Sequence, residues 1–311
     1  MPQVTYKAGG EGIERELTVE IHEQDAPPWG ADATLRLVGG AHPRPDGALK
    51  ATGQARYTQD VTQPRMAYAG ALLAPYGHAT LRQADEAAAR AVKGVLEVRV
   101  ERREIKHAGQ PVAWVCAESE RALKDGLRAL APVYEVLPAA VTTEDAMREG
   151  APEVEPGKGN VVIDGQRGRQ GNPEAFEKAY ADSPIKVEAE FRTQVQTHSA
   201  LEPHGSLSVP GPAGDAVVYA STQATSAFQG LGRALGLDGP VRVIADHVGG
   251  GFGAKFGPLP GDQAAAGFAN KLQRPVKYMC TRREEHLVGG MRPDSIQRLK
   301  LGGTKDGQVL A

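Results

Sequence analysis

The pattern of apolar and polar residues predicts a chain that mixes strands and helices. In its first half, short apolar or alternating runs are typical of strands, and they occur at 66–73, 95–100, 111–116 and 133–136. Between the last two runs, Ser119 can cap the N-terminus of a helix. The apolar residues of that helix repeat at helical spacing: Ala122, Leu123, Leu127 and Leu130. These elements would form one compact α+β unit.

The second half opens with a polar stretch that is rich in glycine and proline. Residues 138–171 contain GAPEVEPGKGN and DGQRGRQGN, which is typical of a long loop or linker. Asn172 and Pro173 then offer an N-cap and a first helical residue. The elements expected afterwards are a helix at 174–180, strands at 185–191, 216–220, 241–246 and 276–280, and helices at 224–235 and 262–272.

The last residues predict a β-hairpin. A strand at 296–301 leads to the turn residues Lys305, Asp306 and Gly307, and 308–311 begins a return strand. Because a natural domain seldom leaves a strand barely begun, we expect a fragment, a cleavage product or a split subunit that another polypeptide completes.

Composition and charge narrow the classes of function. The 311 residues are 41% hydrophobic and 24% charged, which fits a folded protein of about two domains. Lys and Arg (36) nearly balance Asp and Glu (38), and this argues against nucleic-acid binding. The sequence has no apolar run of membrane-spanning length and no secretion signal. Its two cysteines, Cys116 and Cys280, are too few for an iron–sulfur cluster, so redox chemistry would need a bound cofactor.

The densest chemical signal is a glycine loop after the expected strand 241–246. Gly249, Gly250, Gly251 and Gly253 place four glycines within five residues, so backbone N–H groups can approach an anion or an oxo group. The spacing also satisfies G-x-G-x-x-[GA], the fingerprint of a nicotinamide dinucleotide fold. The sequence GPLPG at 257–261 interrupts the helix that this fold requires, and no acidic residue follows about 20 positions on. By itself the loop leaves dinucleotide binding and a tight structural turn open.

Several segments around the loop point to one family. They are DGALKATGQARYTQD at 46–60, HA at 78–79, GV at 94–95, THSALEP at 197–203, STQ at 221–223, RALGL at 233–237, VRV at 241–243, GGGFGAK at 249–255 and RP at 292–293. Together they resemble the molybdenum-binding (molybdopterin) subunit of the xanthine dehydrogenase and aldehyde oxidase family. The resemblance covers about residues 36–311 and only the N-terminal part of that subunit, whose full length is more than twice that of this chain.

The resemblance implies an α+β fold with a definite order of domains. A lead segment would occupy 1–40, a hammerhead-like α/β domain 41–150 and a linker 151–171. Residues 172–311 would then form the first, incomplete portion of the molybdopterin cofactor-binding domain.

The resemblance also assigns roles to site residues. Molybdenum would be held by a pterin dithiolene, with no protein side chain on the metal. Gln223 would donate to the apical oxo group, and Gly250, Gly251, Phe252 and Gly253 would bind the cofactor through the backbone. The alternative interpretations are a polar residue near a helix N-terminus for Gln223 and a core aromatic for Phe252.

Phe252 and Phe256 are expected in the substrate pocket. Purine-oxidising members of the family carry a glutamate where Phe256 stands, so an aldehyde or aromatic substrate is favoured, although Phe256 could instead pack in the core. The catalytic residue is unknown, because the family's base glutamate lies beyond this chain. Glu202, close in sequence to His198 and His204, could replace it, but a scaffold role is favoured.

The resulting hypothesis is a molybdenum hydroxylase subunit, an enzyme active only with a further chain that supplies the base. It would oxidise an aldehyde to a carboxylic acid, or hydroxylate an aromatic N-heterocycle, with water-derived oxygen. The expected cofactor is molybdopterin in its cytosine dinucleotide form. Partners would be a chain carrying the C-terminal half, an iron–sulfur subunit and an FAD subunit, in the cytoplasm or, alternatively, exported with a partner to the periplasm. The alternatives are an NAD-dependent dehydrogenase and a non-catalytic half-subunit that scaffolds the cofactor.

Overall fold

The computed structural model describes residues 3–8, 15–20, 29–30, 32–101, 103–161, 171–212 and 214–311. By its internal contacts the chain divides into two compact units, Met1–Ala55 and Arg56–Ala311. Most of the N-terminal connector (25–31) and residues 162–170 of the expected linker lie outside the described residues.

The first unit contains an antiparallel hairpin of β1 (Gln3–Ala8) and β2 (Arg15–Glu20), followed by the short helix α1 (Gly47–Ala51). Thr5 lies opposite Thr18, and their hydroxyl oxygens are 2.9 Å apart. The polar pair favours this register, because opposed threonines stabilise antiparallel strands.

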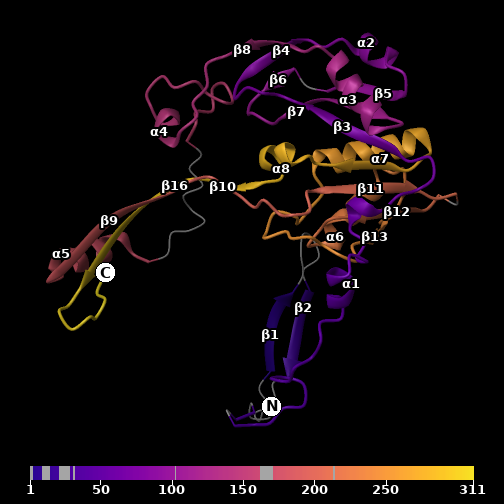
Figure 1. Ribbon diagram of the computed structural model, residues 1–311. Coiled ribbons are helices and arrows are strands. Elements are labelled where there is room, and N and C mark those ends of the chain that lie inside the picture. The colour runs from indigo at the N-terminus through magenta and orange to yellow at the C-terminus, as the bar shows by residue number, and fades with distance from the viewer. Residues whose placement is uncertain are drawn as a thin grey trace. The chain divides into compact units, whose positions relative to one another are not determined.

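The second unit is built on a mixed sheet of seven strands (Figure 1). In spatial order these are β13 (Arg242–Ile244), β12 (Ala216–Ala220), β11 (Gly205–Pro210), β14 (Val276–Met279), β3 (Ala67–Leu73), β7 (Pro111–Ala117) and β5 (Val95–Val100). Strand β14 pairs in parallel with β3, and Val276 lies opposite Ala67. One sheet therefore takes strands from both sides of the expected linker, and the division into domains at 151–171 stays a prediction.

Strand β7 is buried on both faces, which explains its unbroken apolar run PVAWVCA. Trp114 and Cys116 face the main hydrophobic cluster, whereas Ala113 and Val115 face another, which includes α2 (Glu86–Ala91). The second cluster also contains residues of α3 (Glu120–Ala129), whose N-cap Ser119 accepts a hydrogen bond from the backbone N of Ala122 at 3.2 Å. Both faces of the sheet are covered here.

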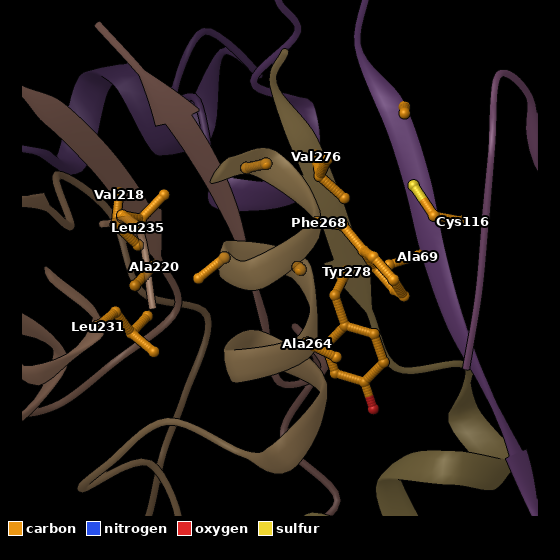
Figure 2. Packing of buried hydrophobic residues seen from close by; sticks show 14 of the residues in the cluster. Ala69, Cys116, Val218, Ala220, Leu231, Leu235, Ala264, Phe268, Val276 and Tyr278 are labelled. Atoms are coloured by element: carbon orange, nitrogen blue, oxygen red, sulfur yellow. The ribbon is translucent and has the colours of Figure 1, made fainter. Parts of the chain in front are cut away.

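Helix α7 (Pro260–Leu272) fills the centre of the main cluster. Its buried face is made largely of alanines, which lets the helix approach the sheet closely. Phe268 provides the bulk on this face and is directed towards Val276 and Ala69 (Figure 2). The helix begins at Pro260, where the missing N–H has no helical partner to lose.

Several shorter elements of this unit lie outside the seven-stranded sheet. They are η1 (Thr58–Asp60), β4 (Ala79–Gln83), β6 (Glu104–Ile105), β8 (Val133–Val136), α4 (Thr143–Ala146), β10 (Gln196–Thr197), α8 (Arg282–Val288) and β15 (Met291–Arg292). Strands β6, β4 and β8 form a three-stranded sheet, and β10 pairs with β15. Within the described residues no helix is both long and apolar enough to span a bilayer.

The helix expected at 224–235 is wrong in its extent. The structure has only α6 (Thr225–Phe228) and a 3-10 turn, η2 (Gln229–Gly232). Gly232 lies directly against the backbone, and a Cβ there would come within 2.2 Å of the carbonyl oxygen of Gly239. Glycine permits this approach but weakens helix propagation.

A long ribbon of β9 (Ile185–Thr193) and β16 (Ser295–Gly303) carries α5 (Pro173–Asp182) on its polar side. The Tyr180 hydroxyl of α5 donates to Glu188 at 2.8 Å. Val187 and Leu301 are paired on the other side of the ribbon and remain about half exposed. The confirmed mixture of strands and helices thus extends to the end of the chain.

Candidate functional site

The glycine loop, residues 249–255, has a backbone that only a glycine-rich sequence adopts easily. Gly250 and Gly253 have φ of 104° and 96°, and Phe252 between them has φ of 54°. The N–H of Ala254 donates to the carbonyl of Gly251 at 2.9 Å and closes the turn. Within the described residues, the N–H groups of Gly250, Gly251 and Phe252 have no hydrogen-bond partner. The loop therefore presents three consecutive unused donors.

Gln223, which follows β12, fixes this loop from one side. Its Oε1 accepts hydrogen bonds from the N–H groups of Gly253 at 3.0 Å and Lys255 at 3.3 Å. Because both hydrogen bonds use Oε1, the Nε2 of this amide is left as a donor. Gly251 has to lack a side chain, since a Cβ there would lie 2.3 Å from Oε1 of Gln223.

The sequence and the structure differ in the use of one predicted donor. The N–H of Gly253 is already engaged by Gln223, so this residue supports the shape of the loop. The N–H of Gly250, which was also predicted as a donor, is unused within the described residues.

Glu202 holds the first end of the loop. Its Oε2 accepts hydrogen bonds from the N–H of Gly249 at 2.7 Å and from the Ser221 hydroxyl at 2.9 Å. Its Oε1 accepts one from the N–H of Thr58 at 3.2 Å. A buried carboxylate with three donors is a structural bridge, and these contacts support the scaffold role over a role as base.

Lys255 holds the other end of the loop from inside the protein. Its side chain is 0% exposed, and its Nζ donates to the carbonyl of Glu202 at 2.6 Å and to the Ser221 hydroxyl at 2.6 Å. Burial lowers the pKa of Lys255, and the nearby negative charge of Glu202 opposes that shift. Sequence reasoning missed this anchor, because a lysine beside glycine and alanine looks like a surface residue.

A buried pair connects the loop to α8. The Nδ1 of His204 lies 3.0 Å from Oε1 of Glu285, and its Nε2 lies 3.2 Å from the carbonyl oxygen of Ala254. Burial raises the pKa of Glu285, but hydrogen bonds from the side chain and backbone of His204 outweigh it, so the pKa is lowered. The loop is therefore packed on a network of satisfied polar groups, which keeps its donors in place.

A pocket of about 400 Å³ opens beside the loop. It is lined by Gln196, Thr197, His198, Phe252 and Arg292. Phe252 is 65% exposed and forms part of the wall of this pocket. Phe256 is 59% exposed, so it does not pack in the core, and it is not among the lining residues.

These donors fit a metal that brings its own ligands. Three backbone N–H groups and the Gln223 amide can bind oxo or oxyanion atoms. In the part of the chain that the structure describes, no three His, Cys, Asp or Glu side chains gather as metal ligands would. The arrangement suits a cofactor whose metal is held by an organic group and only surrounded by protein.

The second half of the chain matches a known protein family. Residues 154–311 match the family described as the molybdopterin cofactor-binding domain. The chain belongs to this molybdopterin-binding family. Within the curated proteins, the chain is similar to relatives named as a xanthine dehydrogenase and as the molybdenum-binding subunit of an aldehyde oxidoreductase.

Two relatives illustrate the extent of this likeness. Xanthine dehydrogenase of Emericella nidulans is 27% identical over 329 residues, which cover 96% of this molybdopterin-binding chain and 23% of the relative. The aldehyde oxidoreductase molybdenum-binding subunit of Escherichia coli is 27% identical over 301 residues, or 89% of this chain and 39% of that subunit. The chain thus spans well under half the length of both relatives.

Solved structures show the same fold. Quinoline 2-oxidoreductase from Pseudomonas putida aligns with a TM-score of 0.75 and 23% identity over 87% of this molybdopterin-binding chain and 38% of that chain. Aldehyde oxidoreductase from Desulfovibrio desulfuricans aligns with a TM-score of 0.77 and 22% identity over 88% and 34%, respectively.

Proposed function

We propose that the chain is part of a molybdenum hydroxylase that oxidises an aldehyde to a carboxylic acid or hydroxylates an aromatic N-heterocycle. The observation that carries the proposal is the loop with unused N–H groups at Gly250, Gly251 and Phe252, clamped by Gln223. The names of the relatives, which include an aldehyde oxidoreductase and a quinoline oxidoreductase, support this class of substrate.

The residues of the chain would bind and orient rather than react. Bound molybdopterin would supply a two-electron redox centre that introduces oxygen from water. The three loop N–H groups would bind the oxygen atoms of the cofactor, and Nε2 of Gln223 would donate to an oxo group. Phe252 would close the substrate pocket against water. Phe256 stands where purine-oxidising members of the family carry a glutamate, and this resemblance favours a substrate that needs no acidic residue to hold it.

Further components belong to the proposal. The base glutamate would come from a polypeptide corresponding to the rest of the subunit. Iron–sulfur and FAD partner chains would carry the electrons away, and the cofactor would be the cytosine dinucleotide form. Residues 41–150 would act as the hammerhead domain, and the assembly would work in the cytoplasm.

One observation favours a second candidate, a half-subunit that only scaffolds the cofactor. The pocket beside Phe252 is lined by no carboxylate among the described residues, so it holds no glutamate of the kind that the proposed base would be. Such a chain would become active only when its companion binds.

Molybdenum content tests the proposal. We expect native mass spectrometry of the assembly purified from its source to show about one molybdenum per copy, together with a companion chain. In the Gly251→Ala variant a Cβ would displace Gln223, so molybdenum per copy should fall at least about tenfold. Gly257→Ala is the matched control, because a Cβ there meets nothing within 4 Å. An assembly of this chain alone without molybdenum would refute the proposal, and an unchanged content in Gly251→Ala would refute the role of the loop.

A further inference from the structure

The pocket beside the glycine loop has two nitrogen groups that the proposed cofactor contacts do not use. Strands β10 and β15 pair antiparallel, and Gln196 lies directly opposite Arg292, so both side chains are on one face. These residues and Phe252 from the loop line the same pocket. The pocket is thus lined by the aromatic ring of Phe252 from the loop and by the polar side chains of Gln196 from β10 and Arg292 from β15.

Arg292 is exposed and lines this pocket. Its guanidinium makes no hydrogen bond or ion pair with any residue that the structure describes. Its Nη2 would lie 3.5 Å from a Cβ placed on Gly253, so the group lies against the loop. By contrast, the nearby Arg282 donates to the carbonyl of Leu201 at 2.9 Å. A guanidinium without a partner at a pocket wall is suited to bind a carboxylate or phosphate through paired N–H groups.

His198 supplies the second observation. Its Nδ1 is buried and has no hydrogen-bond partner in the described part of the chain. Buried polar atoms are nearly always satisfied, so an unsatisfied ring nitrogen on a residue that lines a pocket indicates a missing partner. The hydroxyl of Thr197, also on this wall, lies 3.3 Å from that of Ser199 and keeps a further acceptor or donor position.

We propose that this pocket is an oxyanion subsite, in which Arg292 and His198 bind a carboxylate or phosphate and Phe252 packs against the apolar group that carries it. Among the residues that the structure describes, no carboxylate lines the pocket to repel an anion. Its volume of about 400 Å³ is sufficient for one aromatic ring with such a group. Two sources share this chemistry: the carboxylate of the substrate and the phosphate of the cofactor. If the subsite binds the carboxylate of the substrate, the substrates of the enzyme are anionic. This case rests on the proposed function.

Calorimetric titration of the full chain, with no molybdenum added, tests the subsite directly. The probes are benzoate, the neutral isostere benzamide and inorganic phosphate. The variants are Arg292→Gln and, as a control of equal charge change, Arg121→Gln, whose side chain is 93% exposed on α3. We expect benzoate to bind at least about tenfold more tightly than benzamide, and only Arg292→Gln to weaken it by about tenfold or more.

The relative affinities distinguish the two sources. Benzoate binding without phosphate binding supports the carboxylate of the substrate, and phosphate binding with weak benzoate binding supports the cofactor. In the assembled enzyme the first source further requires Arg292→Gln to raise KM for 4-carboxybenzaldehyde and not for benzaldehyde. Equal binding of benzoate and benzamide, or equal loss in both variants, would overturn the subsite. Because the titration needs no molybdenum, its failure is separable from failure of the proposed function.

Discussion

Lys255 shows how a single buried side chain supports the glycine loop. Its Nζ reaches the carbonyls of Glu202 and Pro203 and the hydroxyl of Ser221. The carboxylate of Glu202 accepts from that same hydroxyl, so the lysine also compensates a buried negative charge. We therefore expect these contacts to contribute to the free energy of unfolding of the whole fold.

We expect Lys255→Met to lower the free energy of unfolding by about 3 kcal/mol, since it leaves two carbonyls without their donor and the buried Glu202 carboxylate without a nearby positive charge. Urea denaturation measures this. The control is Lys271→Met, whose side chain is 63% exposed in an ion pair with Glu97 and should cost less than about 1 kcal/mol. Equal losses in the two variants would contradict the importance of the buried network.

Sequence patterns predict the backbone chemistry of the site better than its side-chain partners. The glycines were predicted from a local motif and Gln223 from the family resemblance, and the structure places them together. Lys255 and Arg292 were missed as functional candidates. Their roles depend on which distant segments fold against them, and a local motif holds no record of those neighbours. The one sequence feature that could have pointed to Arg292 is the Arg-Pro pair at 292–293, which resembles the family.

At the scale of elements, the start of α7 contains an unusual carboxyl group. Asp262 is buried, accepts from the Ser206 hydroxyl at 2.6 Å and from the N–H of Leu259 at 2.7 Å, and lies in the first turn of the helix. Burial raises the pKa of Asp262 from 3.8 to about 6, more than those hydrogen bonds lower it.

This shift predicts a stability that falls with rising pH. Between about pH 4 and pH 6 the folded protein keeps a proton on Asp262 that the unfolded chain has released, so the contribution of this group is lost as pH rises through that window. Between pH 4 and pH 7, we expect the free energy of unfolding of the wild type to fall by about 2–3 kcal/mol more than that of Asp262→Asn. Measuring the unfolding free energy of both proteins at both pH values tests this. Asp125→Asn on the exposed side of α3 should keep the wild-type profile. A constant difference between wild type and Asp262→Asn would contradict the shift.

The periodicity of apolar residues predicted most helices and strands. It did not predict a strand whose buried positions are occupied by polar residues. Strands β5 and β8 are confirmed at the expected residues. Strand β11 was missed, because Ser206 and Ser208 occupy fully buried positions and give no hydrophobic alternation. Ser206 can be buried because its hydroxyl donates to Asp262. That compensation is a tertiary contact, which a local pattern does not contain.

At the scale of the whole molecule, the seven-stranded sheet makes the two halves of the chain interdependent. Strand β14 is hydrogen-bonded on one side to β11 and on the other to β3. We therefore expect residues 172–311 expressed alone to lack a cooperative thermal transition, because β14 would lose its partner β3 and α7 would lose part of its apolar cover. Residues 56–311 are the control and should unfold cooperatively. A sharp calorimetric transition in 172–311 would show that the shared sheet is dispensable.

The same pairing has a consequence for biosynthesis. Ala67 of β3 and its neighbour Val276 of β14 are about 200 residues apart in the chain. At roughly 5–20 residues per second, a ribosome needs on the order of 10–40 s to deliver the second strand after the first. During that interval one edge of β3 lacks its native partner, and chaperones that shield such edges would determine how much of the newly made chain reaches the folded state.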